Sequence, residues 1–240
     1  MRQNKQIIKI MEENGGYATL GYLYQVVETK DWKTKTPFAS IRRIVQDGKY
    51  FFKIRPGLWA LNEHRDAVLK KFNLETGKRN DDNTFNHTYY QGLIVEIGNM
   101  QNFKTFVPHQ DKNKLFLERP LKTICGIETI YEFSYSTILQ RAKTIDVIWF
   151  NNRRLPHAFF EVEYSTDFQN SLGKYSDLQD FNCKLFLVSS AEKKRRFEDI
   201  IKRGIFNEIK QRVQFLDFNY ISALHAKTIE IIELQKVVKL

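Results

Sequence analysis

The sequence predicts a mixed α/β protein (α+β overall) in two parts. The first part has a helical apolar rhythm that ends in two short apolar strands, and the second alternates buried strands with helices between residues 144 and 188. A polar stretch separates the two parts. Hydrophobic residues make up 42% of the 240 residues, which is enough to build a core in each part.

The first part reads as three helices followed by a β-hairpin. Apolar residues recur at helical spacing, Asn14-Gly15-Gly16 is a helix stop, and Thr36-Pro37 is a typical helix start. Arg55-Pro56-Gly57 forms the turn between the two strands. The expected helices span residues 5–13, 20–29 and 36–46, and the expected strands span 50–54 and 58–61.

Three helices and a hairpin are typical of a winged helix-turn-helix, and residues 1–65 resemble the winged-helix domains found beside bacterial restriction enzymes. The third helix would then be the recognition helix, because a helix of this kind enters the major groove. Arginine suits both phosphate and guanine contacts through its two parallel donors. The alternative is a winged helix that packs against protein. The predicted DNA contacts are Ser40, Arg42 and Arg43 on the third helix and Lys49, Lys53 and Arg55 on or near the wing.

The predicted domains are residues 1–66 for the DNA-binding part, 67–85 for a linker, and 86–240 for the second part. The linker is assigned from its polar composition, with few apolar anchors. The second part opens with a helix over 86–99, in which Tyr89, Leu93 and Ile97 share one face. Strands at 103–107 and 115–117 and a helix at 136–143 follow.

The informative stretch is a hairpin of two apolar strands, 144–150 and 157–164, joined by a turn. Side chains alternate across a strand, so Glu161 and Glu163 point to one face, and Asp146 joins them if the register is compatible. Neither strand carries a Lys or Arg, and burying three carboxylates without a positive charge is costly. A divalent cation is the simplest compensation, and all-oxygen ligands suit Mg²⁺. The alternative is a solvated polar face, which Ile148, Phe150 and Phe159 on the same face disfavour.

The order strand, turn, strand, helix, strand, with Asp146 and then Glu161-Val162-Glu163, resembles the PD-(D/E)xK nuclease superfamily. The helix starts near Ser165-Thr166-Asp167, the last strand covers 183–188, and the resemblance spans roughly residues 85–215. It implies that Asp146, Glu161 and the backbone carbonyl of Val162 bind Mg²⁺, for which Mn²⁺ is expected to substitute.

The same resemblance gives roles to two further acids. Glu163 stands where the family usually has Lys, and it would orient or deprotonate the attacking water. Glu96 matches the acid that the family often places on its first core helix and would reach the metal through water; the alternative is an ordinary exposed helix glutamate. Gln169 and Lys174 either touch the scissile phosphate or belong to a plain helix surface. The five histidines are scattered, and none pairs at metal spacing.

These features favour a type II restriction enzyme, a Mg²⁺-dependent and sequence-specific endonuclease that acts on double-stranded DNA. A net charge of +10 fits a polyanionic partner. The alternatives are a DNA-binding protein with an inactive nuclease-like domain, and a nuclease directed to RNA or repair. A homodimer is expected, since symmetric cutting of a duplex needs two sites.

The remaining expectations concern cofactors and compartment. There is no GxxxxGK[ST] motif, so no nucleotide cofactor is expected. Two cysteines without a CxxC pair, no apolar leader and no long apolar run favour a cytoplasmic protein without membrane contact.

Overall fold

The computed structural model describes residues 3–75, 79–165 and 167–238. The chain divides into two compact units, Met1–Asp82 with Ser222–Leu240, and Asn83–Ile221. The unit boundaries fall within α5 (Arg79–Met100) and α9 (Phe218–Val238). Helices and a mixed sheet make up the second unit, so the expected mixed α/β class is confirmed. Among the described residues, no helix has the length and apolar character that a membrane span needs.

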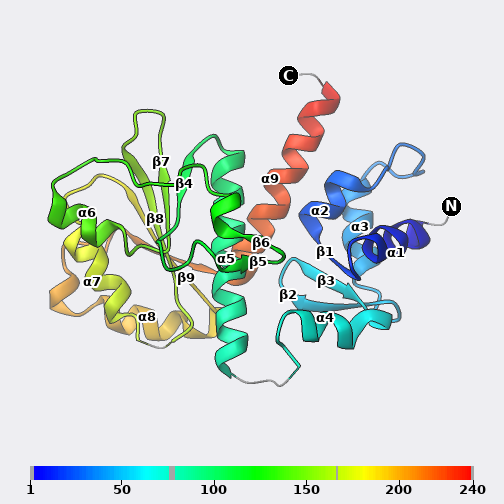
Figure 1. Ribbon diagram of the computed structural model, residues 1–240, viewed down its shortest axis with the longest axis horizontal. Helices are drawn as coiled ribbons and strands as arrows, with labels where there is room; N and C mark the ends of the chain where they lie inside the picture. The colour runs from blue at the N-terminus through cyan, green and yellow to red at the C-terminus, as the bar shows by residue number, and fades with distance from the viewer. Residues whose placement is uncertain (1–2, 76–78, 166, 239–240) are drawn as a thin grey trace. The chain divides into compact units, whose positions relative to one another are not determined.

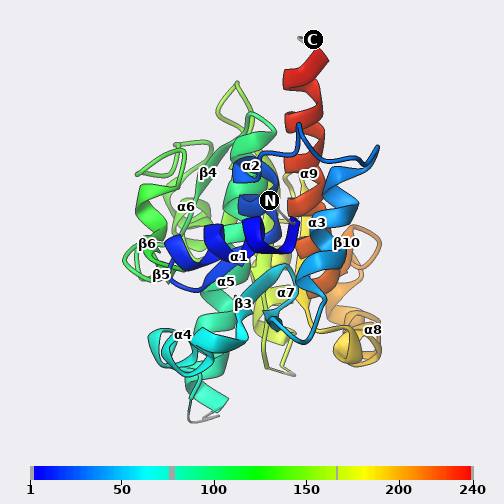
Figure 2. The same cartoon turned by 90° about the vertical axis from the view of Figure 1, so that its right-hand side faces the viewer.

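Within residues 3–75 the first unit contains the expected helices and hairpin and, in addition, a short strand and a fourth helix. In Figures 1 and 2 its helices gather beside a small antiparallel sheet of order β1-β3-β2. The elements are α1 (Gln3–Glu13), β1 (Tyr17–Thr19), α2 (Leu20–Val26), α3 (Pro37–Val45), β2 (Phe51–Arg55), β3 (Leu58–Leu61), the 3-10 turn η1 (Asn62–His64) and α4 (Arg65–Lys71).

Local sequence signals fix several of these boundaries. Gly15 and Gly16 have φ of 77° and 88°, as expected for a left-handed helix stop. Pro37 opens α3, although the side chain of the preceding Thr36 makes no capping hydrogen bond. Ile41, Ile44 and Val45 of α3 are buried, which leaves other faces of the helix for polar side chains.

Two predicted boundaries differ from the structure. Much of the predicted linker, 67–85, is helical, since α4 occupies Arg65–Lys71 and α5 begins at Arg79; residues 76–78 lie outside the described residues. Val68 and Phe72 are buried and anchor α4. The prediction missed this helix because two apolar positions are too few to outweigh the polar composition of the stretch.

The second difference is at the C-terminus. The predicted second domain runs to residue 240, whereas Ser222–Leu240 group with the N-terminal residues. The Ser222 hydroxyl donates to the carbonyl of Pro56 at 2.7 Å. α9 also approaches α2 closely, because a Cβ on Gly21 would lie 2.3 Å from Ile229 Cδ1.

The second unit is built on a mixed sheet of order β10-β9-β8-β7-β4, with five strands in the described part of the chain. β7 pairs antiparallel with both β4 and β8, whereas β9 pairs parallel with both β8 and β10. The strands are β4 (Lys104–Phe106), β7 (Val147–Phe150), β8 (Pro156–Val162), β9 (Lys184–Ser189) and β10 (Val213–Asp217), with a separate pair β5 (Leu115–Phe116) and β6 (Arg119–Pro120).

Helices cover both faces of this sheet, which explains why its central strands are apolar on both sides. Figure 1 shows α5 on one face and the remaining helices of the unit on the other. Gly98 allows α5 close approach, because a Cβ there would lie 2.6 Å from Trp149 Nε1. The remaining elements are α6 (Ser136–Ala142), α7 (Gln169–Asp177), α8 (Lys194–Ile201) and the 3-10 turns η2 (Leu121–Thr123), η3 (Ala191–Lys193) and η4 (Gly204–Phe206).

Candidate active site

The site lies where β7 begins and β8 ends. The antiparallel register pairs Val147 with Phe160, and one step further it sets Asp146 beside Glu161. Two hydrogen bonds hold this arrangement: the Val162 N–H donates to Asp146 Oδ2 at 2.7 Å, and the Asp146 N–H donates to Glu161 Oε1 at 3.3 Å. The register that the sequence left open therefore brings the two acids together.

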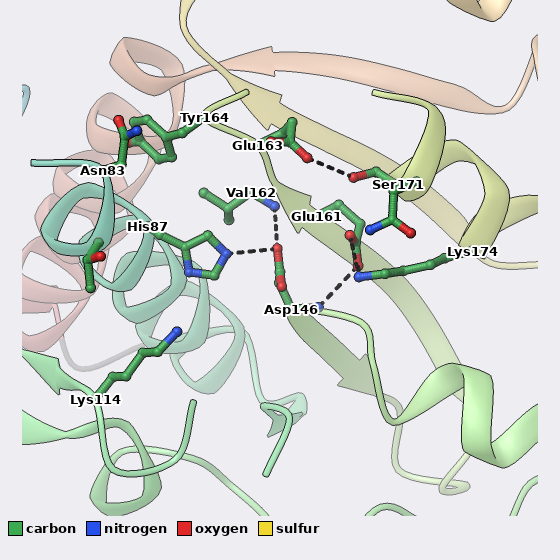
Figure 3. A pocket seen from close by; sticks show the side chains of 12 residues that line it. Asn83, His87, Lys114, Asp146, Glu161, Val162, Glu163, Tyr164, Ser171 and Lys174 are labelled. Atoms are coloured by element: carbon green, nitrogen blue, oxygen red, sulfur yellow. Dashed lines mark hydrogen bonds and ion pairs between the residues drawn. The ribbon is translucent and has the colours of Figure 1, made fainter. Parts of the chain in front are cut away.

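These acids open into a pocket of about 350 Å³. Figure 3 shows its walls: α5 supplies one side, α7 supplies the other, and the end of β8 lies between them. The pocket is lined by Asn83, Thr84, His87, Lys114, Asp146, Glu161, Val162, Glu163, Tyr164, Asn170, Ser171 and Lys174.

Glu161 forms a buried ion pair with a lysine from α7. Lys174 Nζ lies 2.8 Å from Glu161 Oε2 and 3.0 Å from Oε1, and it also donates to the carbonyl of Thr144 at 2.8 Å. The two side chains are only 12% and 3% exposed. The interpretation of Lys174 as plain helix surface is thus wrong. The acids do have a positively charged neighbour, which comes from a helix and not from the two strands.

Asp146 has a different partner, on the opposite wall. His87 Nε2 lies 3.2 Å from Asp146 Oδ2, and the other ring nitrogen, Nδ1, is buried without a hydrogen-bond partner among the described residues. Burial lowers the pKa of His87, but the charge of Asp146 and the hydrogen bond to it prevail and raise that pKa above its usual value.

The two acids have opposite pKa shifts. Burial raises the pKa of Glu161 well above its ordinary range, and the charge of Asp146 adds to this effect while Lys174 opposes it. Burial also acts to raise the pKa of Asp146, but His87, Lys174 and the Val162 N–H together bring it below its ordinary value. Even with Lys174 present, the surroundings of Glu161 disfavour its negative charge.

Glu163 lines the same pocket from just beyond the end of β8. Its Oε1 accepts from the Ser165 N–H at 2.7 Å, and its Oε2 accepts from the Ser171 hydroxyl at 3.3 Å. Ser171 precedes Lys174 by one helical turn of α7, so both glutamates face α7, as Figure 3 shows.

Glu96 is not brought to the site. Its carboxylate forms an ion pair with Arg119, and it does not line the pocket. It follows His87 by nine residues on α5, which corresponds to about 13 Å along a helix axis at 1.5 Å per residue. The residues of α5 that do reach the pocket lie two to four turns earlier, at Asn83, Thr84 and His87.

The capacity of the site for a metal rests on two carboxylates. In the described ranges, no group of three or more His, Cys, Asp or Glu side chains is arranged to hold a metal ion. Mg²⁺, however, is usually bound through one or two carboxylates together with water and substrate phosphate. The donor set formed by Asp146, Glu161 and the carbonyl of Val162 suits such an ion.

The predicted DNA-contacting residues differ in their exposure and in their contacts within the protein. Arg43 on α3, Lys49 and Lys53 are exposed. Arg42 donates to the Tyr24 hydroxyl at 3.0 Å and lies 3.8 Å from Glu230, so it is held within its own unit. Among the half-buried residues, the Ser40 hydroxyl donates to the Thr36 carbonyl at 3.2 Å, and Arg55 donates to the Ile54 carbonyl at 2.7 Å.

Sequence reasoning missed His87 and misjudged Lys174. A signal for Lys174 was present, since it lies next to the buried Tyr175 and one turn after Ser171, at the border of the apolar face of α7. His87 and Gln91 are spaced i, i+4 on α5, where Gln91 is buried and His87 is half-buried, so each polar side chain needs a partner. Neither signal identifies that partner without the fold.

Two comparisons with known proteins found matches. The curated type II restriction enzyme NmeDI from Neisseria meningitidis serogroup C is 29% identical over 99 residues, which is 39% of this chain and only 28% of the relative. No solved structure matches the chain. Residues 68–238 match the family model of the type II restriction enzyme NmeDI C-terminal domain. The chain therefore belongs to the family of that C-terminal domain.

Proposed function

We propose that this protein is a Mg²⁺-dependent, sequence-specific endonuclease that hydrolyses phosphodiester bonds in double-stranded DNA, with a nuclease core of the PD-(D/E)xK type. The observation that carries the proposal is the pair of buried carboxylates, Asp146 and Glu161, set side by side by the hairpin register at a polar pocket. Membership in a restriction-enzyme family supports the choice of DNA as substrate.

In this proposal Asp146, Glu161 and the carbonyl of Val162 hold Mg²⁺ or Mn²⁺. The raised pKa of Glu161 supports it, because burial and the charge of Asp146 outweigh Lys174, so a further positive charge would stabilise the ionised carboxylate. When bound, the ion would lower the pKa of a coordinated water and stabilise negative charge on the phosphate oxygens.

Lys174 takes the part of the lysine that the family usually carries at the position of Glu163. Its ammonium reaches the site from α7 and contacts Glu161 directly, so it can donate to the attacking oxygen or to a phosphate oxygen. Glu163 lines the same pocket with both oxygens engaged by Ser165 and Ser171, and it orients the water.

The first unit is proposed to read the DNA as a winged helix-turn-helix, with α3 as recognition helix and the β2–β3 hairpin as wing. The order of its elements and the exposed cations Arg43, Lys49 and Lys53 support this role. A homodimer would supply the two active sites needed to cut both strands.

Digestion of phage DNA by the purified full chain tests the proposal. With Mg²⁺ or Mn²⁺ we expect discrete fragments whose ends share one sequence, and with EDTA we expect uncut DNA. Undiminished cleavage in EDTA contradicts the metal mechanism. DNA binding without any cleavage in either metal favours the alternative of an inactive nuclease-like domain, to which the departure at Glu163 points.

A further inference from the structure

A second polar cluster lies behind the α5 wall of the pocket. Gln91 is fully buried, and its amide Nε2 donates to Asp111 Oδ2 at 2.7 Å and to the backbone carbonyl of Asp146 at 3.1 Å. Asp111 is 3% exposed. The cluster therefore connects a buried carboxylate from the loop before β5 to the backbone of a proposed metal ligand.

Lys114 completes the cluster at the pocket. Its Nζ lies 2.6 Å from Asp111 Oδ1, and its side chain is 40% exposed and lines the pocket. The Lys114 N–H donates to the Asp111 carbonyl at 2.9 Å, so a short turn fixes the spacing of the two residues. One side of the ammonium is held by a buried carboxylate while the other remains open to the pocket.

Two observations indicate that this position receives an anion. In Figure 3 the Lys114 ammonium points toward the His87 ring, whose Nδ1 is buried without a partner in the part of the chain that the structure describes. The second observation is that the Lys114 side chain is exposed to the pocket. A lysine that only neutralised Asp111 would need no such exposure, whereas a lysine that binds phosphate needs an open side and a fixed direction.

Resting on the proposed function, we infer that Lys114 binds a backbone phosphate of the DNA beside the scissile bond, and that Asp111 and Gln91 are positioning residues that aim it. Lys174 and Lys114 then border the acidic centre from opposite walls. The duplex backbone enters between them, with the scissile phosphate at Asp146 and Glu161 and a neighbouring phosphate at Lys114.

The test measures how strongly binding depends on salt, using the full chain and a mixed-sequence DNA duplex with Ca²⁺ in place of Mg²⁺. Loss of one phosphate contact lowers the slope of log affinity against log salt by about 0.9 and weakens binding about tenfold at low salt. We expect both changes in Lys114→Ala. Lys112→Ala is the matched control, since Lys112 donates to the Glu128 carbonyl and does not line the pocket.

Removing Lys114 alone leaves Asp111 buried without its cation, which could disturb the fold for reasons unrelated to DNA. The double variant Asp111→Asn/Lys114→Ala removes both charges and separates the two roles. We expect it to keep the reduced slope and the weak binding.

The outcomes separate this inference from the proposed function. A wild-type slope in Lys114→Ala, or recovery of wild-type affinity in the double variant, overturns the phosphate role and leaves Lys114 as a neutraliser of Asp111 only. Failure of the wild-type chain to bind or cut DNA at all overturns both.

Discussion

The two units carry their charged residues in opposite ways. In Asn83–Ile221 the acids Asp146 and Glu161 are 9% and 2% exposed, and each is paired with a residue from another element. In the first unit, the cations Arg43, Lys49 and Lys53 stand exposed on α3, in the turn before β2 and on β2.

The contrast has energetic consequences. A buried charge must be compensated where it stands, so its removal disturbs chemistry and stability together. An exposed charge is screened by salt, so its removal changes the free energy of unfolding little. Its removal matters mainly for the binding of a charged partner. Substitutions of the buried ion-paired residues should therefore have large effects in all conditions, and substitutions of exposed cations on α3 should have smaller, salt-dependent effects.

The largest effect is expected from Asp146→Asn. Loss of a proposed metal ligand removes several kcal/mol of transition-state stabilisation, so cleavage should fall by at least about a thousandfold. Binding to DNA should stay close to the wild type, because the proposed DNA contacts are made by other residues, on the first unit and at Lys114. Cleavage rates and gel-shift affinities measure the two quantities.

Asp177→Asn is the matched control for this variant. Asp177 pairs with Arg141 on the surface and does not line the pocket. A cleavage rate for Asp146→Asn close to that of the control would remove Asp146 from the site.

The next effect is expected from Lys174→Ala. If Lys174 supplies the cation of the site, cleavage should fall about a hundredfold, as for the loss of one charge-stabilising donor. In EDTA the variant should also unfold at a lower temperature than the wild type, because buried Glu161 loses its ion pair. Lys143→Ala, on an exposed lysine outside the pocket, is the control. Cleavage within a few-fold of wild type would show that the lysine is structural only.

Arg43→Ala and Arg42→Ala test the exposed side of the comparison. Arg43 is exposed, and a bidentate arginine contact to a base is worth about 1–3 kcal/mol of discrimination. Its removal should relax the preference for cognate over scrambled duplex by about tenfold. Arg42 is tied to Tyr24 and Glu230, so its removal should change thermal stability more than sequence preference. Equal loss of discrimination in both variants would contradict this division.

The same contrast explains what the sequence could predict. The β7–β8 hairpin and the shared face of Glu161 and Glu163 follow from strand alternation, which is a local rule, whereas the register that pairs Asp146 with Glu161 comes from the structure. The α3 start at Pro37 and the glycine stop after α1 are equally local.

Residues whose environment depends on distant partners were not predictable in this way. Lys174 reaches Glu161 from α7, and His87 reaches Asp146 across 59 residues of sequence. Glu96 was predicted as a site residue because it lies on the first core helix. Which turn of that helix faces the pocket depends on the position of the helix along the sheet, which the sequence does not give. Arg42 and Arg43 are neighbours in sequence, and only contacts with α2 and α9 distinguish them.

The smallest effect expected is a gain in stability of the metal-free protein from Glu161→Gln. The folded-state pKa of Glu161 is raised, so its stabilising contribution is complete below its ordinary value of 4.5 and is lost as pH rises through the raised pKa. Asp146, with a lowered pKa, loses its contribution only as pH falls below about its ordinary 3.8, outside that window. The raised pKa of His87 acts in the wild type and the variant alike, so to first order it cancels in their difference.

In EDTA, Glu161→Gln should therefore exceed the wild type in stability by an amount that grows as pH rises above 4.5 and reaches about 1 kcal/mol, or roughly 2–4 °C in Tm. The amide oxygen can still accept from Lys174, which limits the loss of the ion pair. Glu198→Gln, on an exposed glutamate of α8, should run parallel to the wild type at every pH. Added Mg²⁺ should reverse the order, because an ion that binds only the folded wild type stabilises it by mass action. If the stability curves of Glu161→Gln and wild type stay parallel from pH 4.5 upward, the folded protein does not disfavour the charge of Glu161, and the raised pKa no longer supports the metal assignment.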